Sequence, residues 1–304
     1  MRIVFMGTPD FAVASLDALV RSGYDIVGVI TAPDKPAGRG QTLKESAVKL
    51  YAKEKGLNIL QPARLKDETF LNQLRLLRAD LQVVVAFRML PEIVWNMPPK
   101  GTINLHGSLL PQYRGAAPIN WAIINGETQT GVTTFFLKHE IDTGDILFAE
   151  PVNIAPDETA GHVHDRLMKV GAELIVKTVQ AIKSGEYPET EQDGIESSEL
   201  KHAPKIFKDD CLIDWSKPVK TVYDLIRGLS PYPTAFTQLQ YKTLKIFRAD
   251  KEVKNTEIAP GEYISDGKTF LKFACADGYV SVTDVQLEGK KRMKIDEFLR
   301  GVRL

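Results

Sequence analysis

The run Leu81-Gln82-Val83-Val84-Val85-Ala86-Phe87 is apolar at all but one position. A short, nearly continuous apolar run is typical of a strand that is covered on both faces, as in a parallel sheet flanked by helices. It is far shorter than the roughly 20 apolar residues that a membrane-spanning helix needs. The run therefore predicts a central strand of an α/β domain.

Strand-like and helix-like segments alternate on both sides of this run. Strand-like stretches lie at Arg2–Met6, Asp25–Thr31 and Asn58–Gln61 before it and at Thr102–Leu105 after it, separated largely by segments of helical period. Strands that alternate with helices predict βαβ units and a mostly parallel, Rossmann-like sheet. The opening apolar stretch ends at Gly7 with no small-residue cleavage site, so we expect a first strand rather than a signal peptide.

The second half of the chain has a different character. A long helical pattern over 159–183 is followed by a polar segment over 186–204 that has almost no apolar periodicity and reads as a linker. The residues beyond it form short strand-like runs with Gly and Asp turns, which predicts a small β-barrel or sandwich. We expect a first domain over residues 1–188, a linker over 189–204 and a second domain over 205–304.

Charge is unevenly distributed along a chain whose net charge is zero. Residues 205–304 hold 18 Lys and Arg against 14 Asp and Glu, whereas residues 1–204 hold 21 against 25. This asymmetry favours two units with different partners. A polyanion partner is one interpretation of the basic part and a solvated surface is the other. Two cysteines, Cys211 and Cys275, cannot form a disulfide framework or a four-ligand zinc site, and a reducing cytoplasm fits them.

The richest group of polar and special residues begins at Asn104-Leu105-His106 and runs through a Gly- and Pro-rich loop to Pro118. The carboxyl ends of parallel strands are where α/β sheets bind ligands, and residues two apart on a strand point to the same side. An amide donor and an imidazole on one side suit stabilising a developing negative charge while moving a proton. A loop-anchoring Asn and a structural His are the alternative.

A carboxylate is also a candidate, in the turn Asp142-Thr143-Gly144-Asp145. Asp142 either stabilises that turn or orients the imidazole of His106. A dinucleotide site is not favoured, because Gly7-Thr8-Pro9-Asp10 after the first strand holds a single glycine where three are needed.

Taken together, these motifs resemble those of the 10-formyltetrahydrofolate-dependent formyltransferases, and among them the members whose acceptor is methionyl-tRNA. The resemblance spans nearly the whole chain. It is carried by the Asn104-x-His106 pair and by Phe5–Ala12, Pro33–Gly40, Ser108–Pro111, Asp142–Asp145, Ile213–Ser216 and Ser230–Pro233.

The resemblance implies a role for each matching residue. Asn104, His106 and Asp142 would be catalytic, and Arg39 would touch the acceptor end of the tRNA. The folate-binding stretch would be Ser108, Leu109, Leu110 and Pro111. It further implies 10-formyltetrahydrofolate as co-substrate, no metal because the formyl group is already activated, and an OB-fold-like C-terminal barrel that helps hold initiator methionyl-tRNA. A cytoplasmic monomer with no membrane association is expected.

Three alternatives remain at this stage. The acceptor can be the amine of a UDP-amino sugar, it can be water, as in a formyltetrahydrofolate hydrolase, or the chain can be a non-catalytic tRNA-binding protein. The Arg39 loop and the basic C-terminal part favour tRNA. One departure from the family pattern is Arg88, in Phe87-Arg88-Met89, where relatives usually have Tyr-Gly. This strand end lines the pterin pocket in the family, so Arg88 either narrows that pocket or points to solvent.

Overall fold

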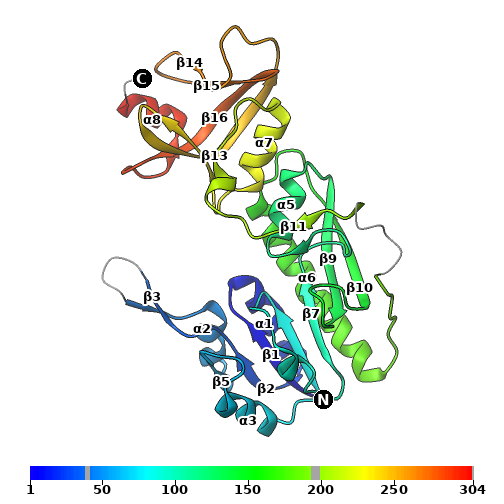
Figure 1. The fold of residues 1–304 in the computed structure, drawn as a ribbon. Helices are drawn as coiled ribbons and strands as arrows, with labels where there is room; N and C mark the ends of the chain where they lie inside the picture. Colours follow the sequence, from blue (N-terminus) through cyan, green and yellow to red (C-terminus); the bar gives the residue numbers. More distant parts are fainter. Residues whose placement is uncertain (38–41, 193–198, 303–304) are drawn as a thin grey trace. The chain divides into compact units, whose positions relative to one another are not determined.

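The computed structural model describes residues 1–37, 42–192 and 199–302 (Figure 1). The chain divides into two compact units, and each is assembled from separate stretches of sequence. The N-terminal unit comprises residues 1–114, 131–152 and 164–201, and the C-terminal unit comprises 115–130, 153–163 and 202–304. Within the described residues, every helix is too short or too polar to cross a membrane.

A seven-stranded sheet forms the centre of the N-terminal unit, in the order β10-β9-β7-β6-β1-β2-β5. Its strands are β1 (Arg2–Gly7), β2 (Asp25–Ile30), β5 (Ile59–Leu60), β6 (Leu81–Val85), β7 (Thr102–His106), β9 (Gln129–Phe136) and β10 (Ile146–Asn153). The neighbours from β7 to β5 all pair in parallel, and β9 runs antiparallel to β7. The predicted mostly parallel α/β sheet is confirmed.

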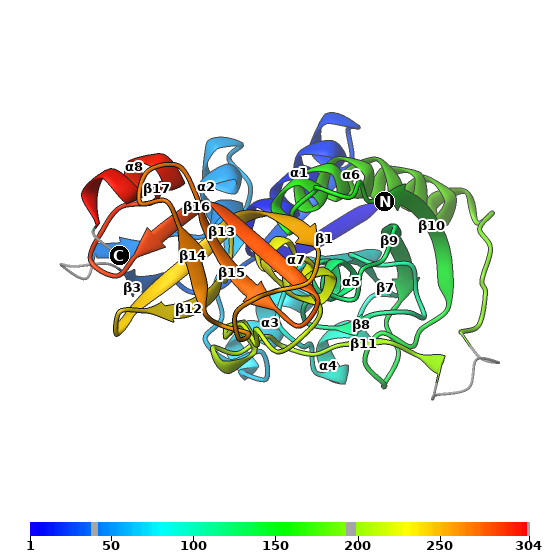
Figure 2. The ribbon, with the colours of Figure 1, turned by 90° about the horizontal axis from the view of Figure 1, so that it is seen from above.

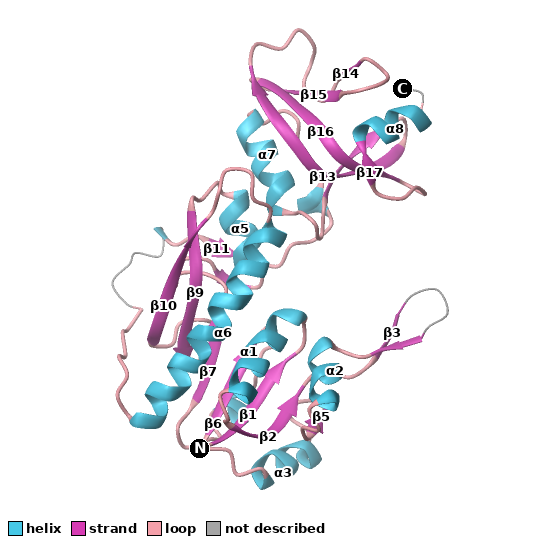
Figure 3. Ribbon diagram, turned by 180° about the vertical axis from the view of Figure 1, so that it is seen from behind, coloured by secondary structure: helices cyan, strands magenta, loops and turns pink. Residues whose placement is uncertain are grey.

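Helices cover both faces of this sheet (Figure 3). They are α1 (Asp10–Arg21), α2 (Ala47–Glu54), α3 (Glu68–Leu76), α4 (Glu92–Trp95) and α6 (Ala160–Ser184). On one face, a Cβ added at Gly171 of α6 would lie 2.7 Å from Leu105 of β7, so helix and strand are in close contact. On the other face, Phe70 of α3 and Val94 of α4 share a buried cluster with Val84 of β6.

Two details differ from the sequence-based expectations. The central strand ends at Val85 rather than at Phe87, because Ala86 has φ +47, a left-handed conformation that cannot continue a strand. The Pro33–Gly40 stretch, for which no strand was expected, contains β3 (Lys35–Ala37), which pairs with β4 (Thr42–Lys44) as a hairpin.

An antiparallel sheet forms the C-terminal unit, in the order β12-β13-β16-β15-β14, with β17 paired to β16 (Figure 2). Its strands are β12 (Ala235–Leu239), β13 (Lys242–Val253), β14 (Tyr263–Ser265), β15 (Leu271–Cys275), β16 (Gly278–Leu287) and β17 (Met293–Lys294). Two short strands, β8 (Arg114–Gly115) and β11 (His202–Ala203), pair with each other. The curled antiparallel sheet confirms the barrel-like second domain, with β12 and β14 as its edges.

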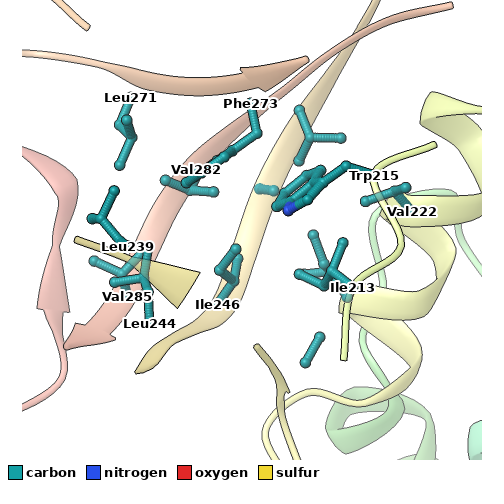
Figure 4. Close-up of a cluster of buried hydrophobic side chains, with 14 of the residues drawn as sticks. Ile213, Trp215, Val222, Leu239, Leu244, Ile246, Leu271, Phe273, Val282 and Val285 are labelled. Atoms are coloured by element: carbon teal, nitrogen blue, oxygen red, sulfur yellow. The ribbon is translucent and has the colours of Figure 1, made fainter. Parts of the chain in front are cut away.

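Trp215 belongs to the buried hydrophobic core of this unit and packs beside Phe273 (Figure 4). Its ring stacks on Phe273 with centroids 4.6 Å apart and planes at 12°, and its indole nitrogen donates to the Thr237 hydroxyl at 2.9 Å. A large apolar ring is thus buried with its one polar atom hydrogen-bonded.

Three helices complete the C-terminal unit: α5 (Pro118–Ile124), α7 (Val219–Gly228) and α8 (Ile295–Gly301). Helix α5 comes from the middle of the chain and was not predicted. Asn120 on α5 donates to the carbonyl of Gly228 at 2.7 Å, and Trp121 donates to the carbonyl of Pro204 at 2.8 Å. These bonds join α5 to elements that lie far along the sequence.

Candidate active site

Asn104 and His106 lie on one face of β7 at its carboxyl end, as their spacing predicts. Leu105 between them points to α6, so both side chains project from the opposite face. In register, Asn104 is paired with Val84, which belongs to the cluster shared with α3 and α4. The amide of Asn104 is partly exposed and has no hydrogen bond among the described residues, so its donors can meet a ligand.

The imidazole of His106 is held from one side by the backbone. His106 is only 6% exposed, and its Nε2 lies 2.8 Å from the carbonyl oxygen of Tyr113. A carbonyl can only accept, so Nε2 carries the proton and donates. The other ring nitrogen, Nδ1, is therefore the one that can exchange a proton with a substrate.

Asp142 faces that second nitrogen. Its Oδ2 lies 3.9 Å from Nδ1 of His106, and the Asp142 side chain is 11% exposed. This separation is too long for a direct hydrogen bond, so the carboxylate faces the imidazole without bonding to it. The structure brings the predicted pair together, but the group that orients the ring by a hydrogen bond is the Tyr113 carbonyl. Sequence reasoning missed it, because a backbone acceptor has no sequence signature.

The turn that carries Asp142 is pressed against the end of β9. A Cβ added at Gly144 would lie 1.6 Å from the carbonyl oxygen of Phe136, so only glycine fits there. The Phe136 N–H donates to the carbonyl of Asp145 at 3.1 Å. Asp142 itself has φ +57, a backbone conformation that residues other than glycine adopt less readily.

The predicted folate-binding stretch directly follows His106. Ser108 is fully buried, and its hydroxyl donates to the carbonyl of Gln112 at 2.7 Å. The Thr133 hydroxyl donates to the carbonyl of Ser108 at 2.7 Å and accepts from the N–H of Leu110 at 3.2 Å. Ser108 thus holds the loop in shape. Of the other residues in the stretch, Leu110 is buried, and Leu109 and Pro111 are partly exposed.

Arg88 is held by the loop that follows β5. Its guanidinium donates to the carbonyls of Ala63 at 3.0 Å and Pro62 at 2.5 Å, and it lies 5.7 Å from the ring centroid of Phe87. Partial desolvation lowers the pKa of Arg88. Arg39, the predicted tRNA contact, lies outside the described residues. Within the described ranges, no three His, Cys, Asp or Glu residues are grouped so as to hold a metal ion.

The positive charge of residues 290–300, the basic stretch near the C-terminus, is partly neutralised by ion pairs. Arg292 binds the carboxylate of Asp284 through two nitrogens, at 2.9 and 2.7 Å, which holds the pKa of Asp284 below its usual range. Arg300 pairs with Asp296 at 3.4 Å. Lys290 and Lys291 are exposed and form no ion pair within the part of the chain that the structure describes. Among the described cations of residues 290–300, they are the ones best placed to meet an external anion.

Both halves of the chain match known families. The model described as Formyl transferase matches residues 1–179, and the model described as Formyl transferase, C-terminal domain matches residues 205–303. A methionyl-tRNA formyltransferase from Bacteroides fragilis is 56% identical over 310 residues, which cover 100% of this chain and 96% of that protein. One from Flavobacterium johnsoniae is 51% identical over 306 residues, which cover 99% and 96%.

Solved structures share the fold at lower sequence identity. The sugar 3N-formyl transferase WlaRD, solved in the presence of dTDP and 5-N-formyl-THF, has a TM-score of 0.68 and 21% identity, covering 96% of this chain and 99% of that chain. HypX from Aquifex aeolicus in complex with tetrahydrofolic acid has a TM-score of 0.68 and 19% identity, covering 99% of this chain and 48% of its own. Because family models match both halves and full-length relatives are more than half identical, the chain belongs to the formyl transferase family.

Proposed function

We propose that this protein transfers the formyl group of 10-formyltetrahydrofolate to the α-amino group of initiator methionyl-tRNA, which yields N-formylmethionyl-tRNA for translation initiation. The observation that carries the proposal is the similarity over the whole chain, second domain included, to relatives named methionyl-tRNA formyltransferase. In this proposal residues 1–188 bind the folate, residues 205–304 hold the tRNA, and the protein acts as a cytoplasmic monomer.

The residues at the end of β7 fit such a co-substrate. A formyl folate supplies an already activated formyl group, so the protein has to align two substrates and move protons. Asn104 offers amide donors that no described residue uses, and His106 offers one ring nitrogen for proton exchange. The loop over 107–113, held in shape by Thr133, follows directly and would form the wall against which the folate lies.

In the reaction we propose, the side-chain amide of Asn104 donates to the formyl oxygen. Negative charge develops there as the bond between the amine nitrogen and the formyl carbon forms. Asp142, whose Oδ2 lies 3.9 Å from Nδ1 of His106, accepts the proton that the amine loses. Nδ1 of His106 gives a proton to the folate nitrogen as the bond between that nitrogen and the formyl carbon breaks.

An acceptor competition tests the proposed function. The purified protein is incubated with 10-formyltetrahydrofolate carrying a labelled formyl group, together with methionyl-tRNA, a UDP-amino sugar or no added acceptor. We expect the label on the methionyl amine, and little on the sugar or in free formate. Label that appears mainly on the sugar would make the protein a sugar formyltransferase, and label released mainly as formate would make it a hydrolase.

Binding of tRNA should depend on salt, because phosphate contacts release counterions. We expect the affinity for methionyl-tRNA to fall at least tenfold between 50 and 200 mM salt, which corresponds to about two or more phosphate contacts. Changing exposed Lys290 and Lys291 to Glu should weaken binding and flatten the salt dependence. The matched control changes Lys66 and Lys100, exposed lysines of the first domain. Equal losses in both double variants would contradict the role of residues 205–304.

A further inference from the structure

The segment after α6, predicted to be a linker, returns to the candidate site. Thr190 pairs with Ile146 at the start of β10 through two backbone hydrogen bonds, of 2.8 and 3.0 Å. Just before it, Tyr187 packs edge-on against Phe136, the last residue of β9, with ring centroids 5.8 Å apart. These contacts fix the path of the chain alongside the turn that carries Asp142.

Gln192 then bridges two parts of the site. Its side-chain nitrogen donates to the carbonyl of Asp142 at 3.0 Å and to the carbonyl of Gly144 at 2.6 Å. Its side-chain oxygen accepts from the guanidinium of Arg114, at 2.8 Å from Nη2 and 3.2 Å from Nε. Arg114 directly follows Tyr113, whose carbonyl holds His106. One amide thus connects the Asp142 turn with the loop that orients the imidazole.

Residues 199–201, farther along the same segment, also contact the loop that contains Gln112 and Tyr113. The N–H of Tyr113 donates to the carbonyl of Lys201 at 2.6 Å. The N–H of Lys201 donates to the side chain of Gln112 at 2.8 Å, whose amide nitrogen in turn donates to the carbonyl of Glu199 at 3.2 Å. The loop that orients His106 is therefore fixed from a second point, independently of Gln192.

We infer that Gln192 is a positioning residue, which sets the placement of the Asp142 carboxylate opposite Nδ1 of His106. This inference rests on the proposed function, since it concerns the same catalytic pair. The two carbonyls that Gln192 binds, of Asp142 and Gly144, lie within the turn, so these bonds fix the backbone from which the Asp142 side chain projects. Gln192 forms no hydrogen bond to Asn104 or His106 among the described residues. It does bind Arg114, next to the loop that orients His106, but Lys201 and Glu199 also hold that loop, so the main effect of Gln192 on the reaction is through Asp142.

Two substitutions distinguish the hydrogen bonds that Gln192 donates to the Asp142 turn from those that it accepts from Arg114. Gln192→Ala removes every contact of the amide. Gln192→Glu keeps the volume and an acceptor for Arg114, but as a carboxylate it has no proton to donate to the two carbonyls. We expect kcat to fall about tenfold or more in both variants, with the KM for methionyl-tRNA within about twofold of the wild-type value, because misplacement of a catalytic group affects mainly the chemical step. Gln180→Ala, at an exposed glutamine on α6, is the matched control and should leave kcat unchanged.

The decisive experiment places Gln192→Ala in a protein that also carries Asp142→Asn. If Gln192 acts through Asp142, its effect on the single-turnover rate should shrink to less than about twofold in that background, because coupled residues are not additive. The same loss of rate in both backgrounds would overturn the inference. So would an unchanged kcat in the single variants, or a loss of rate explained by a smaller folded fraction in thermal unfolding.

Failure of the proposed function is distinguishable from failure of this inference. If the wild-type protein formylates methionyl-tRNA and the Gln192 variants are equally fast, the positioning role alone is refuted. If the wild-type protein formylates another acceptor, or water, the proposed function is refuted. The effect of Gln192→Ala with and without Asp142→Asn, measured with that acceptor, then still decides the role of Gln192.

Discussion

Replacing His106 with Ala is expected to lower kcat by about 10²–10⁴-fold, the usual contribution of a general acid or base. The structure leaves Nδ1 of His106 as the one ring nitrogen able to give a proton to the leaving nitrogen, because Nε2 is bound to the Tyr113 carbonyl. Asp142→Asn should cause a loss of similar order, since it removes the negative charge that faces Nδ1 and keeps the shape of the side chain. Single-turnover rates of formyl transfer measure both effects.

The control for this pair is His139→Ala, a change at an exposed histidine between β9 and the Asp142 turn. It should leave the rate near the wild-type value. Folate binding, followed by titration, should persist in the His106 and Asp142 variants, which separates lost chemistry from lost binding. Near-normal turnover in both variants would refute the assigned roles.

Gly144→Ala is expected to reduce kcat about a hundredfold and also to lower the unfolding temperature. The added Cβ would lie 1.6 Å from the carbonyl oxygen of Phe136, which is backbone and cannot rotate away. The turn has to shift, and a displacement of about 1 Å at a catalytic group costs about 10²-fold in rate. Overpacking of this kind costs about 1–3 kcal/mol of stability. Thermal unfolding and single-turnover kinetics on the same preparation measure the two effects.

Gly301→Ala is the matched control, because a Cβ added there meets no atom of the described residues within 4 Å. It should leave the rate unchanged and should not lower the unfolding temperature, since alanine is tolerated at a helical position. If Gly144→Ala lowered the unfolding temperature but left kcat intact, the position of Asp142 would be insensitive to the turn. In that case the effect of Gln192 on the same turn would also be expected to vanish.

Patterns among residues that are close together in the sequence predicted much of the fold. Apolar runs and helical periods are local patterns, so they predicted β1, β6 and β7, the long helix α6 and the antiparallel second domain. The placement of Asn104 and His106 on one strand face follows from the two-residue period of a strand. The sequence offered Asp142 as a candidate with two possible roles, and the motifs shared with the formyl transferases favoured the catalytic one, because no local pattern joins Asp142 to His106.

Only the tertiary structure decided how the site is held together. The proton lies on Nε2 of His106 because that nitrogen contacts the backbone carbonyl of Tyr113. The hydrogen bond that holds the Asp142 turn joins the side chain of Gln192 to a backbone carbonyl 50 residues away in sequence. The polar composition of 186–204 resembles that of a linker, because Thr190, Gln192 and Lys201 are held through hydrogen bonds rather than through apolar periodicity. Backbone groups are the same in every residue, so their long-range partners are chosen by the packing of the chain and leave no mark in the sequence.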